Sequence, residues 1–346
     1  MTDRVIYLDR GVGETRGVLA LDGRPERLLI HRDDDDPRLG LGARLIARVA
    51  NLEPALATAF LDLGGGLEAI MPFKPEARPV RGAAIEVEIR SEPRDGKLAT
   101  TRYLGAGEGA PRLLARPDGV AEALQRIARD APIREDAQAR VIADEAEAEA
   151  LETLHPLPGG GTLAIEPTRA LTAIDIDLGE RKGGDAKRAT RQANLAGLTE
   201  AARLLRLKGL GGIVVIDLAG RGHDGAALLA AARLAFAADN PGVAFGPISR
   251  FGTLELLIPR RTRPLLDRLR QPGGALSDRT LAQRLIRRLE TEALAQPAAR
   301  LTARCAPAVA RETGPWMAAL AARFGARLTL SEVADYPDDR IDVSAT

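Results

Sequence analysis

The 346-residue sequence predicts a multidomain α/β protein of the α+β type. In this prediction a small β-barrel near the N-terminus is followed by a layered α/β unit and a small C-terminal α/β domain. Three observations support it. Short strand-like segments with Gly and Pro between them fill residues 39–104, apolar strands alternate with amphipathic helices over residues 157–260, and a further amphipathic helix begins near residue 277. The length suffices for two or three domains, each with its own core.

The first 36 residues carry three predicted strands. Apolar residues alternate in segments 5–8, 17–21 and 27–31, which Gly-rich or Asp-Gly turns separate. Asp22 and Gly23 form a favoured hairpin turn. The acidic run 33–36 is expected to be a solvated loop, because four adjacent like charges repel one another.

Residues 37–104 are predicted to form a five-stranded barrel. Five strand-like segments follow one another with Gly and Pro between them, and this spacing is typical of an OB-fold. Residues 105–158 are rich in Ala, Glu, Arg and Asp at helical spacing. We therefore interpret them as a helical remnant or linker.

A layered α/β unit is predicted over residues 159–262. Two strands precede a helix over 194–208, which ends at Gly209 and is followed by a buried strand over 211–220. A second helix over 225–238 and strand-like residues 245–259 complete the unit. Residues 275–346 form the C-terminal domain, with a helix from residue 277 and two strands, 300–304 and 326–333, that frame a helix around Trp316.

Two predicted strands of the layered unit end in carboxylates. Asp175 and Asp177 share a face because residues two apart on a strand point the same way, and Asp217 ends the other strand. If these strands are neighbours, three hard oxygen donors meet at one sheet edge, which suits Mg²⁺. Such an ion polarises a phosphoryl oxygen and supplies a hydroxide nucleophile. An Asp at a strand end is as often a turn residue or a helix N-cap, so spacing alone leaves both interpretations open.

Residues 159–220 closely resemble the nuclease subdomain of the ribonuclease E/G family. They read GGGTLAIEPTRALTAIDIDLGERKGGDAKRATRQANLAGLTEAARLLRLKGLGGIVVIDLAG. The family has an ALTAID strand, an NLEAA-like helix, an RLRDLGG turn and an IVIDF strand in the same order. The similarity continues in ISRFGTLEL, residues 248–256, which is similar to the family's ISRFGLLE.

The resemblance implies a metal-dependent endoribonuclease. It assigns Asp175 and Asp217 as ligands of Mg²⁺, with Mn²⁺ as a substitute, and places Asp177 where the family usually has Asn. The implied catalytic set is Asp175, Asp217 and Asp177. The implied substrate is single-stranded RNA, in RNA processing, including rRNA processing, or in decay.

The resemblance extends to the front of the chain. Residues 14–32 resemble the opening of the family, so residues 1–36 are expected to be the N-terminal strands of a reduced RNase H-like subdomain. Residues 41–74 and 96–104 resemble its inserted OB-fold RNA-binding domain. Two aromatics stack an RNA base there; Phe60 matches the first, and Ile70 replaces the second, so the hold on RNA is expected to be weaker. Without the family, Phe60 would be interpreted as barrel core. The other expected RNA-binding residues, each of which could also be a plain surface charge, are Lys74, Lys97, Arg169, Lys182, Arg188 and Arg191.

The chain departs from the family in two places. Only about fifty residues separate the barrel from residue 159, and no Arg-Thr-Ala segment of the family's 5′-monophosphate pocket is present. Stimulation by a 5′-monophosphate is therefore not expected. Residues 260–277 contain no Cys, so no zinc and no zinc-linked dimer is expected, although a homo-oligomer of another kind stays open.

Composition excludes several classes of protein. Cys305 is the single cysteine, so neither an internal disulfide nor a structural zinc site with several cysteines can form. The N-terminus shows no signal peptide and no apolar run is long enough to span a membrane, so a cytoplasmic location is expected. The net charge of +1 lacks the strong basic signature of proteins that bind nucleic acid mainly through phosphates. Two alternatives to the nuclease therefore remain, a catalytically degenerate RNA-binding paralogue and an assembly module for protein partners.

Overall fold

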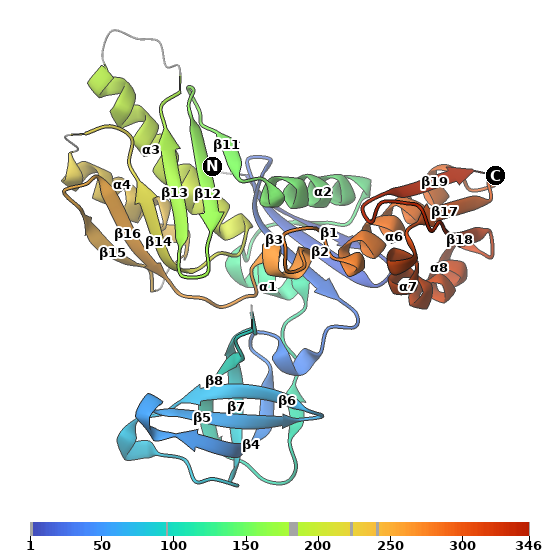
Figure 1. Cartoon of the computed structure of the whole chain (residues 1–346), viewed down its shortest axis with the longest axis horizontal. Helices are drawn as coiled ribbons and strands as arrows, with labels where there is room; N and C mark the ends of the chain where they lie inside the picture. The colour runs from blue at the N-terminus through green and yellow to red at the C-terminus, as the bar shows by residue number, and fades with distance from the viewer. Residues whose placement is uncertain (1–2, 95, 180–185, 222–223, 240–241, 346) are drawn as a thin grey trace.

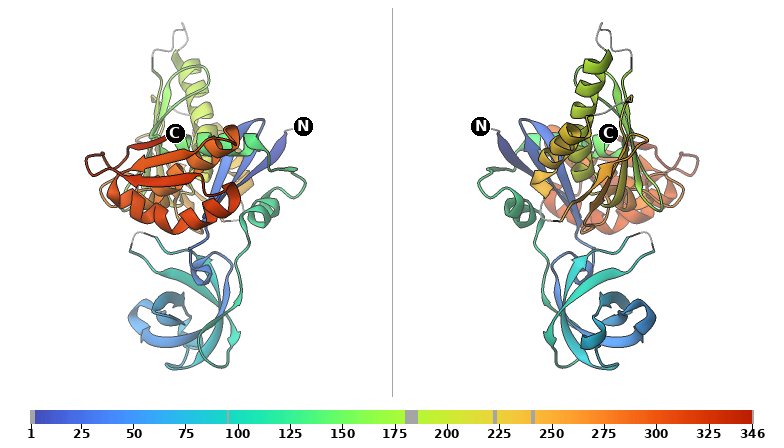
Figure 2. Two further views of the ribbon diagram at one scale, coloured as in Figure 1. Left: turned by 90° about the vertical axis from the view of Figure 1, so that its right-hand side faces the viewer. Right: turned by 90° about the vertical axis from the view of Figure 1, so that its left-hand side faces the viewer.

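The computed structural model describes residues 3–94, 96–179, 186–221, 224–239 and 242–345. The described chain forms four sheets with their helices, and the barrel projects from the other three units (Figures 1 and 2). The predicted mixed α/β class with a closed five-stranded barrel is confirmed. Within the described residues, none of the helices combines the length and the apolar character needed to cross a bilayer.

The N-terminal unit is a sheet covered by helices on both faces. Its strands are β1 (Arg4–Arg10), β2 (Glu14–Leu21) and β3 (Arg24–Arg32), and β10 (Ile133–Arg134) pairs parallel to β1. Helix α1 (Val120–Ile127) covers Ile6 and Leu19 on one face, and α2 (Ala137–Leu151) packs its alanines against Val5 and Val18 on the other. Residues 105–158, interpreted as a remnant or linker, thus supply both covering helices.

The acidic run 33–36 is more than a solvated loop. Asp35 accepts a hydrogen bond from the backbone N–H of Arg32 and pairs with Arg268 at 2.6 Å, while Asp34 pairs with Arg279. Opposite charges from a distant segment therefore compensate the repulsion within the run. These pairs tie the segment before the barrel to the C-terminal third of the chain.

The barrel is built from β4 (Arg44–Glu53), β5 (Thr58–Gly64), β6 (Leu67–Pro72), β7 (Ala84–Ser91) and β8 (Ala99–Ala106). The strand order is β4-β5-β6-β8-β7 with closure back to β4, and β6 and β8 run parallel. Strand β9 (Arg112–Ala115) pairs outside the barrel with β4. The core is aliphatic, apart from Met71. Glu92 anchors the barrel to the layered unit, since its carboxylate accepts the Arg263 N–H at 2.8 Å and its N–H donates to Arg261 O.

The layered unit is a six-stranded sheet with one covered face and one open face. Its order is β11 (Leu154–Pro156), β12 (Thr162–Pro167), β13 (Thr172–Asp177), β14 (Gly212–Asp217), β16 (Thr253–Ile258) and β15 (Ala244–Ile248). Helices α3 (Ala186–Leu207) and α4 (Gly225–Ala235) cover one face, where Ile174, Ile176 and Ile216 are buried. The opposite face leaves Ile213 and Leu257 half exposed. Helix α4 ends at Ala235, three residues before the end of the helix predicted over residues 225–238.

The C-terminal unit contains more elements than the sequence predicted. They are α6 (Asp278–Ala295), β17 (Leu301–Cys305), α7 (Pro307–Thr313), α8 (Met317–Phe324), β18 (Leu328–Glu332) and β19 (Ile341–Ala345). The short helix α5 (Leu265–Leu269) precedes this unit, and its buried leucines pack in the core shared by the layered and N-terminal units. The predicted helix around Trp316 is two helices, and the unpredicted β19 gives the sheet the order β18-β17-β19. Short 3-10 turns complete the described elements: η1 (Pro37–Leu39), η2 (Pro54–Leu56), η3 (Pro75–Ala77), η4 (Ala237–Asp239) and η5 (Gly314–Trp316).

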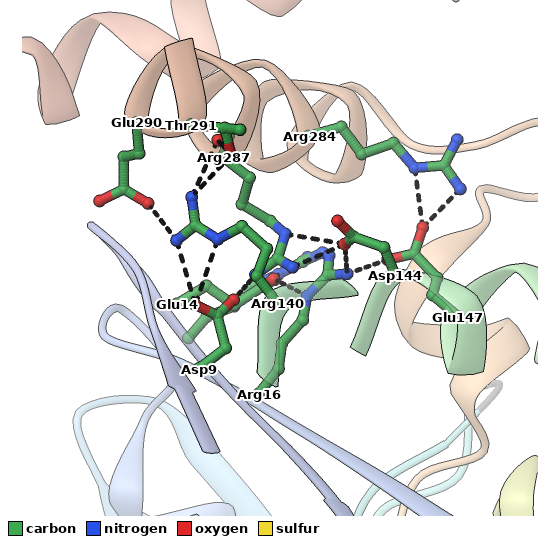
Figure 3. A network of polar contacts seen from close by, with 11 residues as sticks. Asp9, Glu14, Arg16, Arg140, Asp144, Glu147, Arg284, Arg287, Glu290 and Thr291 are labelled. Carbon is green, nitrogen blue, oxygen red and sulfur yellow. Dashed lines mark hydrogen bonds and ion pairs between the residues drawn. The ribbon is translucent and has the colours of Figure 1, made fainter. Parts of the chain in front are cut away.

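A buried ion-pair network joins α6 to the N-terminal unit (Figure 3). Arg287 pairs with Asp9 and, at 2.6 Å, with Asp144. Arg140 bridges Asp9 at 3.1 Å and Glu290 at 2.7 Å. Burial alone would raise the pKa of Asp9, but the guanidinium groups of Arg287 and Arg140 hold it below its ordinary value. The unit is therefore fixed on the N-terminal sheet by charge as well as by apolar contact.

Candidate functional site

Two acids lie side by side at one edge of the layered sheet. Asp177 ends β13 and Asp217 ends β14. Asp175, two residues before the end of β13, is the direct register partner of Asp217 on these parallel strands. Helix α3 lies between these strands in the sequence and returns the chain to the starting end of the sheet, so both strands end at the same edge. The burial alternates along both strands, and both carboxylates face the open side.

The electrostatics of the pair favour a cation. Burial raises the pKa of Asp175, and the neighbouring carboxylates of Asp217 and Asp177 raise it further. Like charges in a partly shielded place repel each other, and a bound cation would relieve this repulsion. Two hard oxygen donors with open space around them fit Mg²⁺, which takes few carboxylates and retains waters.

The acids line a hollow of about 470 Å³ that we call the acidic hollow. Its wall is formed by Asp175, Ile176, Asp177, Leu178, Asp217, Leu218, Ala219, Gly220, Arg221 and Phe251. Asp177 shares the open face, and its Oδ1 accepts a hydrogen bond from the Gly179 N–H at 2.5 Å. In the described part of the chain, no three His, Cys, Asp or Glu side chains gather into a metal cluster. The donor set is thus the pair Asp175 and Asp217, with Asp177 beside it.

Asn194 on α3 fixes the segment that follows Asp217. This buried side chain donates to Ala219 O at 3.1 Å and accepts the Ala219 N–H at 2.9 Å. The buried amide therefore has both its donor and its acceptor engaged, and it holds the end of β14 against the helix. Sequence reasoning missed Asn194. A polar residue within the apolar face of the predicted helix was the available signal.

Phe251 and Arg221 were also missed. Phe251 lies in the turn between β15 and β16 and is 76% exposed, yet it lines the acidic hollow. The guanidinium carbon of Arg250 lies 4.6 Å from the centroid of its ring. Arg221 approaches the hollow from the segment after β14. The motif SRFGT contained the only hint, an aromatic residue in a turn.

Two of the residues predicted for RNA binding on the barrel, Phe60 and Ile70, are neighbours on its outer surface. Phe60 and Ile70 are register partners on β5 and β6, and both point away from the buried barrel core. The interpretation of Phe60 as barrel core is therefore wrong. Lys74 follows β6 and Lys97 lies in the turn before β8, and both are exposed.

The predicted basic residues near the acids do not form one group. Arg188 and Arg191 are exposed on the first turns of α3. This end of the helix lies at the acid edge, as the contacts of Asn194 with Ala219 establish. Arg169 lies in the turn between β12 and β13, at the opposite end of the strand from Asp177. Lys182 falls outside the described residues.

The chain is similar to known ribonucleases over part of its length. Residues 120–261 match the model of the ribonuclease E/G family. Ribonuclease E of Escherichia coli is 34% identical over 148 residues, which cover 40% of this chain and 14% of that protein. Ribonuclease E of Haemophilus influenzae is 35% identical over the same length, with coverage of 40% and 16%.

A plant relative matches a shorter stretch. The chloroplastic ribonuclease E/G-like protein of Arabidopsis thaliana is 33% identical over 114 residues, which cover 32% of this chain and 11% of that protein. The chain thus matches less than a fifth of the length of each of these relatives. The family match includes Asp175 and Asp217 and excludes the barrel.

Proposed function

The chain belongs to the ribonuclease E/G family through residues 120–261, and on this premise we propose that it is an endoribonuclease. It cleaves single-stranded RNA by Mg²⁺-dependent hydrolysis of a phosphodiester bond. Its role is RNA processing, rRNA processing included, or RNA decay. The observation that carries this proposal is the register pairing of Asp175 with Asp217 inside the segment that matches the family.

In this proposal Asp175 and Asp217 hold the metal ion. When bound, Mg²⁺ or Mn²⁺ polarises a phosphoryl oxygen and activates a water molecule. The protein itself sets the position of the two carboxylates through the parallel register and through the clasp of Asn194 on Ala219. Asp177 adds negative charge beside the pair and is oriented by its hydrogen bond from Gly179. The exposed guanidinium groups of Arg188 and Arg191 lie at the same edge, where they attract the RNA backbone.

The barrel supplies the second contact with RNA. Phe60 offers a face for base stacking, and Ile70 beside it offers apolar contact only. Lys74 and Lys97, which are exposed on the same domain, add positive charge. Since stacking contributes about 1 to 3 kcal/mol per base, a barrel with one aromatic residue is expected to hold RNA more weakly than one with two.

One specific pair of observations favours a second candidate function. Ile70 offers no ring for base stacking, and Oδ1 of Asp177 already accepts a hydrogen bond from Gly179, which leaves Oδ2 as its available metal ligand. A catalytically degenerate RNA-binding paralogue would tolerate both. The same experiment distinguishes the two functions.

The test is cleavage of a labelled, unstructured A/U-rich RNA with Mg²⁺. We expect the Asp175→Asn, Asp217→Asn double variant and the addition of EDTA to lower the rate about a hundredfold or more, because a bound metal ion contributes several kcal/mol to such a reaction. Glu255→Gln is the matched control, since this acid lies on the same open face and does not line the acidic hollow. RNA that is bound but left intact with both Mg²⁺ and Mn²⁺ would instead support the degenerate paralogue.

A further inference from the structure

An exposed aromatic ring stands beside the two acids. Phe251 keeps 76% of its surface exposed, whereas Phe236 in the same unit keeps 2%. A ring of this size is normally buried, because its removal from water is strongly favourable. Its exposure on the wall of the acidic hollow leaves the ring open to contact with a ligand.

Hydrogen bonds fix the backbone of the turn that carries Phe251. Ser249 N–H donates to Thr253 O at 2.9 Å, and the N–H of Phe251 itself donates to Ser249 Oγ at 3.2 Å. Gly252 has a φ of +93°, which a glycine adopts without strain. Its carbonyl accepts the N–H of Leu218, the residue after Asp217, at 3.1 Å. The turn is thus tied directly to the strand end that carries the acid.

Two arginines lie in the region of the Phe251 ring. Arg250 lies over it at 4.6 Å from the centroid, and Arg221 lines the same hollow. The hollow therefore brings together one aromatic ring, the guanidinium group of Arg221 and the carboxylates of Asp175, Asp177 and Asp217, while Arg250 lies over the ring. A nucleotide matches this set, because its base can stack on the ring while its phosphates pair with arginine and with a metal ion held by the acids.

We propose that Phe251, with Arg250 beside it, is a stacking platform for the nucleobase that flanks the cleaved phosphate. This inference rests on the proposed function and extends it to the substrate position next to the reaction. In the described part of the chain, the wall of the hollow has no amide or hydroxyl side chain that would read a base edge. Stacking on an aromatic ring tolerates every base, so the platform recognises the presence of a base more than its identity.

The experiment is an abasic scan combined with substitution. A short RNA with one defined cleavage position is made as an intact strand and as strands that lack a single base near that position. Each is cleaved with Mg²⁺ by the wild type, Phe251→Ala, Phe251→Trp and Leu257→Ala. Leu257 is the matched control, since it is 54% exposed on the same sheet and does not line the hollow.

We expect one abasic position to lower kcat/KM of the wild type about tenfold, within the range of a stacking contact. Phe251→Ala should lower kcat/KM on intact RNA by a similar factor. Removal of that base should then lower kcat/KM of the variant little further. Phe251→Trp should stay within about threefold of the wild type, because it keeps a stacking face. Leu257→Ala should match the wild type.

Two results would overturn the platform. One is a Phe251→Ala variant with the kcat/KM of the wild type. The other is a Phe251→Ala variant whose kcat/KM falls by the same factor on every abasic strand as on intact RNA, because the ring and the bases would then act independently. The nuclease proposal would survive either result. If the wild type cleaves nothing, the affinities of the same proteins for the same strands decide. A loss of affinity that requires both Phe251 and one particular base supports the platform, and only the proposed cleavage activity is then wrong. Equal affinities of all variants for all strands reject the platform.

Discussion

At the scale of single residues, a missing side chain sets how closely α3 approaches the acid strand. A Cβ on Gly197 would lie 2.5 Å from Cδ1 of Ile176, the residue between Asp175 and Asp177. A side chain at this position must displace either the Ile176 side chain or the helix itself. The glycine thus serves a close helix–sheet contact, and Asn194, one turn earlier, fixes the other strand through Ala219. Two small features of one helix therefore position both acids.

We predict that Gly197→Ala lowers the free energy of unfolding by about 1 to 3 kcal/mol, because overpacking a tight contact costs this much. Chemical denaturation of the purified protein measures it. Gly225→Ala, also on a helix, is the control. Its new Cβ would meet only Ile248 at 3.9 Å, so this change should be neutral or stabilising by up to about 1 kcal/mol. Equal effects of the two substitutions would refute the packing argument.

At the scale of elements, α6 is a helix with two partners. Its apolar residues, Leu285 and Leu289 among them, pack in the core of the C-terminal unit. Its charged residues face the N-terminal sheet and α2, where Arg284 pairs with Glu147 at 2.7 Å and Arg287 with Asp9 and Asp144. A buried charge is tolerated only when it is paired. The position of the C-terminal unit is therefore determined by a few specific arginines.

We predict that Arg287→Met lowers the free energy of unfolding by about 1.5 to 3 kcal/mol, since the buried carboxylate of Asp9 loses one of its two guanidinium partners. Thermal and urea denaturation measure the change. Arg126→Met is the control: this arginine is mostly exposed and pairs with Asp118 at the surface, where a pair contributes at most about 1 kcal/mol. An Arg287→Met protein as stable as the control would show that the network contributes little.

At the scale of the whole molecule, buried ion pairs join the N-terminal and C-terminal units, whereas the barrel has an apolar core. Burial would raise the pKa of Asp9, Glu14 and Glu147, but arginine partners lower the pKa of each below its ordinary value. Such carboxylates stabilise the fold above their unfolded pKa near 4, and this contribution is lost as the pH falls through the lower folded pKa. Among the described residues, the buried core of the barrel contains no charged side chain.

We predict that acidification from pH 7 toward pH 3 releases the C-terminal unit before the barrel unfolds. Trp316, the single tryptophan, packs with Val12 and Gly13 of the N-terminal unit, so its fluorescence reports on this contact. Hydrogen exchange of the barrel strands reports on the barrel. Asp118→Asn should leave the tryptophan transition unchanged. A single transition shared by both signals would contradict the prediction.

Local patterns predicted much of this protein. The alternation of residues 172–177 and 212–217 placed both acids on the open face of their strands, and the Gly and Pro spacing of residues 37–104 indicated the barrel. These features depend on the period of two along a strand and on turn residues, which nearby sequence encodes. The sequence left open whether the two acid strands are neighbours, and the register of the sheet shows that they are.

Tertiary structure alone decided which distant segments meet. It brought α1 and α2 back across the sheet of residues 4–32, added β19 to the last sheet, and placed the arginines of α6 opposite Asp9 and Asp144. It also set Phe251 beside Asp217 through one backbone hydrogen bond to Leu218. The reason is physical: a short strand, an alanine-rich helix face or a lone aromatic has little local signature. Its position depends on partners far away in the chain.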